Sequence, residues 1–113
     1  MFEIEYKKGL SVFKVELKRA TYKDSEEFKE FLVKELQNKP KGVVIDLSKC
    51  EFIDSAFLGS ILYGSKIISN NGGELRLVAC HMDTEALLDL TGISKLIQVY
   101  ESVNEAEKSL KIS

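Results

Sequence analysis

Residues 43–59 read VVIDLSKCEFIDSAFLG and join the most hydrophobic strand candidate of the chain to an amphipathic helix. The strand candidate, residues 43–47, is interrupted only by Asp46, which is typical of a central strand that is covered on both faces. The helix is expected to cover residues 55–70, because apolar residues recur there at three- and four-residue spacing. Functional groups of such folds gather beyond the carboxyl ends of strands, which is where the turn before this helix lies.

The first residues of the chain predict a β-hairpin. Apolar and charged residues alternate over residues 2–7 and again over residues 11–18, which is the periodicity of strands. Lys8 and Gly9 separate the two runs, so a tight turn with antiparallel pairing is the simplest interpretation.

Helical and strand patterns alternate after this hairpin. The further elements that we expect are a helix from Asp24 or Ser25 to about Asn38, a strand over residues 75–79, a short helix from Asp83 or Thr84 to Gly92, a strand over residues 96–100 and a terminal helix capped by Ser102. Such alternation requires right-handed crossovers and a mainly parallel sheet. Because 113 residues suit one compact core, we predict a single α/β domain over residues 1–113, with a mixed, mainly parallel sheet opened by an N-terminal β-hairpin and about four helices.

Composition and charge narrow the function classes. The chain has 44% hydrophobic and 30% charged residues, a formal net charge of -2 and a pI near 5.5, which together describe an ordinary globular domain. This charge argues against nucleic-acid binding, because nucleic-acid binders concentrate basic residues on one face. No apolar run reaches the roughly 20 residues that span a bilayer, and the N-terminus lacks the apolar core of a signal peptide. We therefore expect a cytoplasmic protein without a nucleic-acid or membrane partner.

No constellation of residues predicts catalysis, a metal centre or a cofactor. A serine nucleophile needs a base, but the only histidine is His81 and the GxSxG motif of serine hydrolases is absent. The phosphate-binding patterns GxxxxGK[ST] and GxGxxG are absent as well. Cys50 and Cys80 lack CxxC spacing and are expected to be reduced structural thiols. Asp46 and Asp54 have no third ligand for a cation, so we expect hydrogen bonds from loop amides or from the helix start instead. The chain is accordingly predicted not to be an enzyme.

Ser55 is interpreted as a regulatory phosphorylation site at the start of a helix. Phosphorylation would add about -1.5 to -2 charges and three acceptor oxygens to a neutral hydroxyl. A helix N-terminus accommodates a phosphate through its free amides and its dipole, so the fold need not be disrupted. The plain alternative is that Ser55 only caps the helix, a role worth about 1 kcal/mol and common for serine.

The pattern of residues 43–48, followed by residues 52–55 and 58–59, resembles the signature of STAS domains, particularly of the bacterial anti-sigma factor antagonists. The resemblance implies that Ser55 is phosphorylated by a partner that is both a serine kinase and an anti-sigma factor. It also implies regulation of transcription by partner switching, in which the unphosphorylated protein binds this kinase and frees a sigma factor that it affects only indirectly. Phosphorylation of Ser55 would inactivate the protein, and a serine phosphatase is a further candidate partner.

The residues expected to form the partner-binding surface beside Ser55 are Asp54, Ala56, Phe57 and Ser60. Two of them depart from the family pattern, which commonly has serine or threonine and then glycine where this chain has Ala56 and Phe57. The loss of the second hydroxyl leaves Ser55 as the only acceptor of the motif, and Phe57 is expected to put a bulky aromatic ring near the docking surface. Asp46 and Ser48 are expected to support the site through hydrogen bonds.

Two other functions stay open from the sequence. The residues at positions 56 and 57 would also suit a STAS domain that is never phosphorylated and serves as a structural or interaction module of a signalling or transport assembly. A small nucleotide- or lipid-handling enzyme is the third candidate, because the sheet edge could form a pocket.

Overall fold

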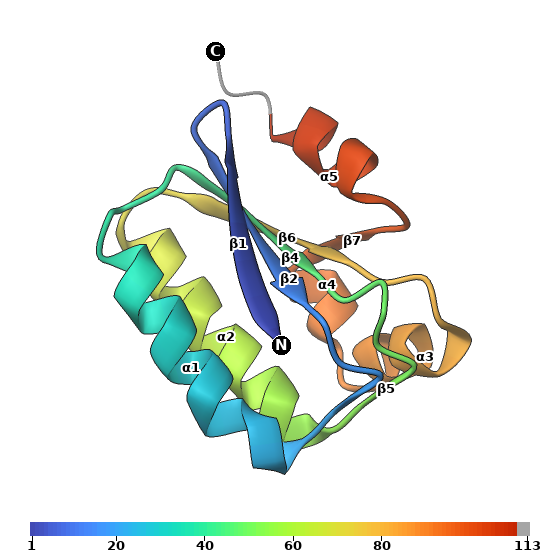
Figure 1. Cartoon of the computed structure of the whole chain (residues 1–113). Coiled ribbons are helices and arrows are strands. Elements are labelled where there is room, and N and C mark those ends of the chain that lie inside the picture. The colour runs from blue at the N-terminus through green and yellow to red at the C-terminus, as the bar shows by residue number, and fades with distance from the viewer. Residues whose placement is uncertain (111–113) are drawn as a thin grey trace.

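The computed structural model describes residues 1–110 and contains a five-stranded sheet with helices on both faces (Figure 1). The sheet has the order β1-β2-β4-β6-β7. Its strands are β1 (Phe2–Lys7), β2 (Leu10–Val15), β4 (Gly42–Asp46), β6 (Glu74–Val78) and β7 (Gln98–Tyr100). β1 pairs antiparallel with β2, and all the other neighbours pair in parallel. The predicted α/β fold, with a mixed, mainly parallel sheet opened by a hairpin, is confirmed.

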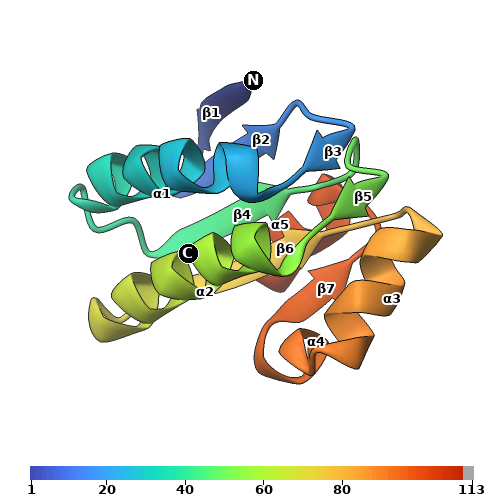
Figure 2. The same cartoon turned by 90° about the horizontal axis from the view of Figure 1, so that it is seen from below.

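The helices of the described residues form two layers. They are α1 (Tyr22–Leu36), α2 (Ser55–Asn70), α3 (Met82–Leu90), α4 (Ile93–Leu96) and α5 (Val103–Ser109). α1 and α2 lie side by side on one face of the sheet, and α5 covers the opposite face (Figures 1 and 2). The unexpected helix is α4, whose four residues are too few for a periodic pattern to show. Within residues 1–110, no helix combines the length and the apolar character that crossing a membrane requires.

Burial on both faces explains why the central strand β4 is almost wholly apolar. Val43 and Ile45 are buried in a core cluster that includes Phe28 of α1. Val44 is buried in a second cluster, together with Ala106 of α5. Successive side chains of a strand point to opposite faces, so both sets of β4 side chains must be hydrophobic.

α1 begins earlier than the sequence predicts, because Thr21 caps it instead of Asp24 or Ser25. The Thr21 hydroxyl accepts a hydrogen bond from Lys23 N at 3.4 Å, and Asp24 Oδ2 accepts one from Thr21 N at 3.1 Å. This reciprocal arrangement is a capping box in which Asp24 occupies the third helical position. The carboxylate predicted as the cap therefore acts from inside the first turn.

A second sheet of two very short strands is not predicted by the sequence. β3 (Arg19–Ala20) pairs in parallel with β5 (Phe52–Ile53). Two residues are too few to show the alternation of a strand. The second strand of the predicted hairpin accordingly ends at Val15 instead of residue 18, and the chain turns away from the main sheet to meet β5.

The two glycines Gly73 and Gly59 allow a matched test of how closely the backbone packs at Gly73. A Cβ at Gly73 would lie 2.8 Å from Pro40 O, whereas a Cβ at Gly59 would have no atom within 4 Å. We expect Gly73→Ala to lower the free energy of unfolding by about 1–3 kcal/mol, because the backbone would have to move. Gly59→Ala should raise it by about 0.5–1 kcal/mol, because alanine favours the helix. Urea denaturation of both variants checks this, and equal stability of the two would contradict the packing described.

Candidate functional site

The short β3–β5 ladder brings the starts of α1 and α2 together (Figure 2). Ala20 is paired with Ile53, and Ala20 O accepts a hydrogen bond from Asp54 N at 3.1 Å. Since α1 starts at Tyr22 and α2 starts at Ser55, both first turns follow almost directly from the ladder.

The Asp54 carboxylate binds the first turns of both helices. Its Oδ1 accepts a hydrogen bond from Phe57 N at 3.0 Å, and its Oδ2 accepts one from Tyr22 N at 2.8 Å. Asp54 is therefore the N-cap of α2, and it also satisfies an amide of α1 that has no acceptor within its own helix. The interpretation of Ser55 as the helix cap is wrong, because Asp54 has that role.

Ser55 is the first residue of α2, and its side chain is exposed. Ala56 and Gly59, which lie on the same end of the helix, are exposed as well. No hydrogen bond of the Ser55 hydroxyl is found within residues 1–110. The first amides of a helix carry the positive end of its dipole, so this hydroxyl lies in a setting that favours negative charge.

Phe57 and Ser60, which the sequence predicts at the docking surface, are buried instead. Phe57 is 0% exposed and stacks on Phe28 of α1, with ring centroids 4.8 Å apart. The Ser60 hydroxyl donates a hydrogen bond to Ser25 O at 2.8 Å. Both side chains lie on the face of α2 that packs against α1, so their predicted surface position is wrong. Phe57 therefore takes part in the packing between two helices.

Asp46 and Ser48 shape the turn at the end of β4. Asp46 Oδ1 accepts a hydrogen bond from Ser48 N at 2.9 Å, and Ser48 O accepts one from Cys80 Sγ at 3.4 Å. No hydrogen bond joins either residue to Ser55 in the described part of the chain. Residues 1–110 also contain no group of three or more His, Cys, Asp or Glu side chains that could hold a metal ion.

Thr84, for which the sequence predicts only a role as a helix start, holds α3 against the segment between β4 and β5. Its hydroxyl donates a hydrogen bond to Cys50 O at 2.9 Å, and the residue is 0% exposed. Burial raises the pKa of the Cys50 thiol to about 12, and the nearby charge of Asp46 adds to this shift. The hydrogen bond from Thr84 to Cys50 O joins residues 34 positions apart, so no local sequence pattern could have predicted it.

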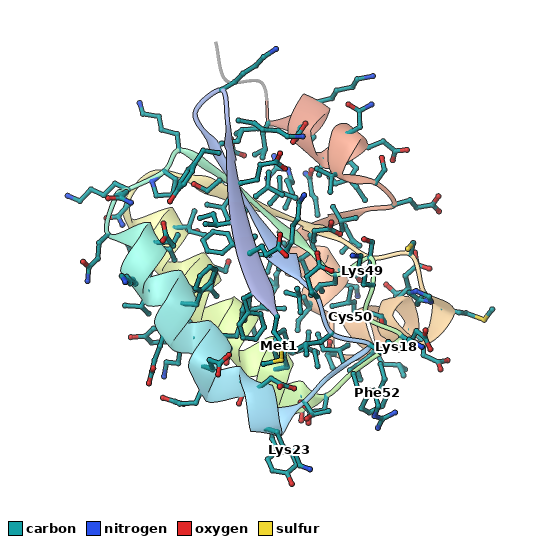
Figure 3. All side chains as sticks on the ribbon, in the orientation of Figure 1. Met1, Lys18, Lys23, Lys49, Cys50 and Phe52 are labelled. Carbon is teal, nitrogen blue, oxygen red and sulfur yellow. The ribbon has the colours of Figure 1, made fainter. Side chains whose placement is uncertain are left out.

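Aromatic and basic side chains reach solvent around the joined helix starts. The Arg19 guanidinium lies 4.4 Å from the centre of the Phe52 ring, as a cation–π pair. Tyr22, the first residue of α1, is 67% exposed. Figure 3 shows Lys23 and Phe52 at this same end of the molecule.

The sequence of residues 3–106 matches the family model of the STAS domain. The chain belongs to the STAS-domain family. A Thermotoga maritima relative, provisionally named an anti-sigma factor antagonist, is 33% identical to this STAS domain over 85 residues, which cover 74% of the chain and 75% of the relative.

Solved structures share the fold of this STAS domain. An anti-sigma factor antagonist from Mycobacterium paratuberculosis superposes with a TM-score of 0.91 at 22% identity, covering 99% of this chain and 94% of that chain. SpoIIAA of Bacillus in its phosphorylated form superposes with a TM-score of 0.74 at 13% identity, covering 98% of this chain and 100% of that chain. At these identities the likeness concerns the fold alone.

Removing the Asp54 carboxylate should destabilise the STAS domain. Asp54→Ala deletes the acceptors of both helix-start hydrogen bonds, so we expect the free energy of unfolding to fall by about 1–3 kcal/mol. Asp54→Asn keeps one acceptor oxygen and should lose less. Urea denaturation measures both, and an Ala variant as stable as the natural protein would show that the carboxylate does not hold the two helices.

The two cysteines should differ in reactivity. Cys50 is buried and its pKa is raised to about 12, whereas Cys80 is exposed. Because the thiolate is the reactive form, we expect iodoacetamide at pH 8 to modify Cys80 alone in the folded protein and both thiols in denaturant. Mass spectrometry identifies the modified residue, and a Cys80→Ser variant that is modified rapidly while folded would contradict the burial of Cys50.

Proposed function

We propose that this STAS domain is an anti-sigma factor antagonist that works by partner switching. In its unphosphorylated form it binds an anti-sigma factor serine kinase and so frees a sigma factor, and phosphorylation of Ser55 ends this binding. The protein acts in the bacterial cytoplasm, without a cofactor, and catalyses no reaction itself. The observation that carries the proposal is the exposed Ser55 at a helix start that the neighbouring carboxylate already caps.

A phosphate on Ser55 is compatible with the fold. Because Asp54 caps α2, modification of the Ser55 hydroxyl removes no hydrogen bond from the helix. The first-turn amides and the helix dipole favour the added negative charge, whereas the Asp54 carboxylate opposes it. That carboxylate is already hydrogen-bonded to the amides of Phe57 and Tyr22, which offset its charge. The modification therefore alters the surface and leaves the core unchanged.

The docking surface that we propose is made of four exposed residues near the starts of the two helices. They are Ser55, Ala56 and Gly59 of α2 and Tyr22 of α1. Ala56 has only a methyl side chain and Gly59 has none, so a partner backbone could approach the Ser55 hydroxyl closely. A phosphate in the middle of this surface would have to lose its water on binding, and it would repel acidic groups of the partner. Asp54 contributes by holding the surface in place, and Phe57 and Ser60 contribute from beneath it.

The relatives support this proposal. The Thermotoga maritima relative is provisionally named an anti-sigma factor antagonist. SpoIIAA, an anti-sigma factor antagonist of the same fold, has been solved in phosphorylated and unphosphorylated forms. We extend the modification to Ser55 of this chain, and we infer that a serine phosphatase restores the binding-competent form.

The burial of Phe57 bears on the alternative of a module that is never phosphorylated. Part of the case for that alternative is an aromatic ring on the docking surface, but the ring of Phe57 faces α1. Ala56 is then the one exposed departure from the family pattern within this motif. It removes a second hydroxyl and leaves the Ser55 acceptor in place, which is compatible with the switch.

The phosphorylation site can be tested with two serine variants of the same helix. With ATP and the cognate kinase, we expect phosphate transfer to the natural protein and to Ser69→Ala, whose mutated serine is exposed near the other end of α2. Ser55→Ala should accept no phosphate and should still bind the kinase. Intact-mass measurement gives the result, and phosphorylation of the Ser55→Ala variant at another residue would refute the site assignment.

The charge switch can be tested without a kinase reaction. Ser55→Asp should weaken the complex with the anti-sigma factor at least about tenfold, because a charged group must be desolvated at the interface. Ser55→Asn, which has the same shape without the charge, should bind nearly as well as the natural protein. Isothermal titration calorimetry compares them, and equal affinity of the Asp and Asn variants would contradict a switch by charge.

A further inference from the structure

α3 presents a row of apolar side chains to solvent. Met82 is 81% exposed and Leu90 is 84% exposed, and the exposed Ala86 lies between them. Residues four apart share one face of a helix, so these three side chains form a single row. The opposite side of α3 is anchored by the buried Thr84 and Leu88. The helix therefore holds its apolar row in a fixed position on the surface.

Carboxylates flank this row on both sides. Helical geometry places the exposed Asp83 on one side and Glu85 and Asp89 on the other. None of these three side chains forms a salt bridge within residues 1–110. An apolar row with unpaired acidic flanks is complementary to apolar side chains that are flanked by lysine or arginine.

A groove runs beside the acidic flank. It has a volume of about 270 Å³ and is lined by Glu85, Leu88, Asp89, Ser94 and Val99. Its wall thus combines two carboxylates with apolar surface. A long basic side chain suits such a groove, because its methylene stem can cover the apolar part while its charged end meets the carboxylates.

We propose that this face of α3, defined by the apolar row and its acidic flanks, docks an amphipathic helix of a partner protein whose apolar side chains are flanked by lysine or arginine. A helix is the fitting occupant because rows of side chains four residues apart pack into the grooves of a facing helix. This docking surface is separate from the one proposed at Ser55. The two surfaces also differ chemically. Negative charge weakens binding at the Ser55 surface, whereas the carboxylates of the α3 face attract a basic partner.

Charge disfavours the other possible occupants of this face. In a symmetric pair of copies, α3 would face α3 and bring its acidic residues against the same residues of the second chain. An anionic membrane surface would be repelled by Asp83, Glu85 and Asp89 for the same reason. A partner with basic flanks turns these carboxylates into attractive contacts.

The experiment uses the full chain and a synthetic helical peptide with leucine along one face and lysine on both flanks. A matched peptide with glutamate in place of lysine is the control. We expect the lysine peptide alone to bind, with NMR shift changes of the labelled protein confined to α3 and α4. Binding of both peptides alike, binding of neither, or shift changes elsewhere would overturn the proposal.

Variants of exposed residues make the assignment specific. Leu90→Ser should weaken binding of the lysine peptide about tenfold or more, and Met82→Ser provides a second variant should the first fail to fold. Asp89→Lys should also weaken it, whereas Glu30→Lys on the exposed face of α1 should not. Ser55→Asp should leave this affinity unchanged, in contrast to its expected effect on the anti-sigma factor. Sedimentation that shows a dimer lost in Leu90→Ser would assign the face to a second copy and overturn the proposal.

Discussion

One carboxylate holds the starts of two helices that are far apart in the sequence. Asp54 accepts a hydrogen bond from Phe57 N at 3.0 Å within α2 and from Tyr22 N at 2.8 Å at the start of α1. Each helix start has amides without intrahelical acceptors, so an aspartate between two starts can satisfy one amide of each. The β3–β5 ladder brings Asp54 to this position, where Asp54 N donates to Ala20 O. Ser55 is consequently fixed in its backbone and free in its side chain.

The contact between α1 and α2 continues from this point toward the other end of the helices. Phe57 stacks on Phe28, and the Ser60 hydroxyl donates a hydrogen bond to Ser25 O. The absence of a side chain at Gly64 allows the helices to approach closely, since a Cβ there would lie 3.0 Å from Leu32 Cδ1. Protein interiors are close-packed, so a change in side-chain volume at the contact between α1 and α2 affects the packing of both helices. Phe57 fits because the aromatic ring of Phe2 in β1 also lies nearby, with ring centroids 6.4 Å apart. Phe57 thus belongs to the core and not to the exposed surface.

Strong periodicity is what made parts of the fold predictable. Alternation over residues 2–7 and the apolar run over residues 43–47 predict the hairpin and the central strand, and both are confirmed. The β3–β5 ladder is too short for a pattern and depends on residues 30 or more positions apart, so the sequence could not show it. Which faces of α2 are buried is harder to predict, because the helix is covered on two sides, by the sheet and by α1. Spacing shows that Phe57 and Ser60 share a face, but it does not show that α1 covers this face.

The candidate site, like the fold, has parts that the sequence predicts and parts that it does not. The motif around Asp54 and Ser55 could be located from sequence, because an aspartate and a serine at a strand-to-helix turn form a local pattern. Their roles could not be separated, since either side chain can cap a helix. The long-range hydrogen bond to Tyr22 N decides between them, because it requires the Asp54 carboxylate to lie between the helices. The exposed row on α3 was likewise hidden, because an apolar face is normally expected to be buried.

On our proposal, Asp54 fixes the helix starts, and charge at Ser55 changes only the surface. The most direct measurement compares amide NMR spectra of the protein with phosphoserine or serine at position 55. We expect shift changes confined to the first turns of α1 and α2 and to the β3–β5 ladder, with β4 and β6 unchanged. Changes throughout β4 and β6, or loss of the dispersed spectrum, would show that the phosphate disrupts the fold and that Asp54 does not isolate the core from charge at Ser55.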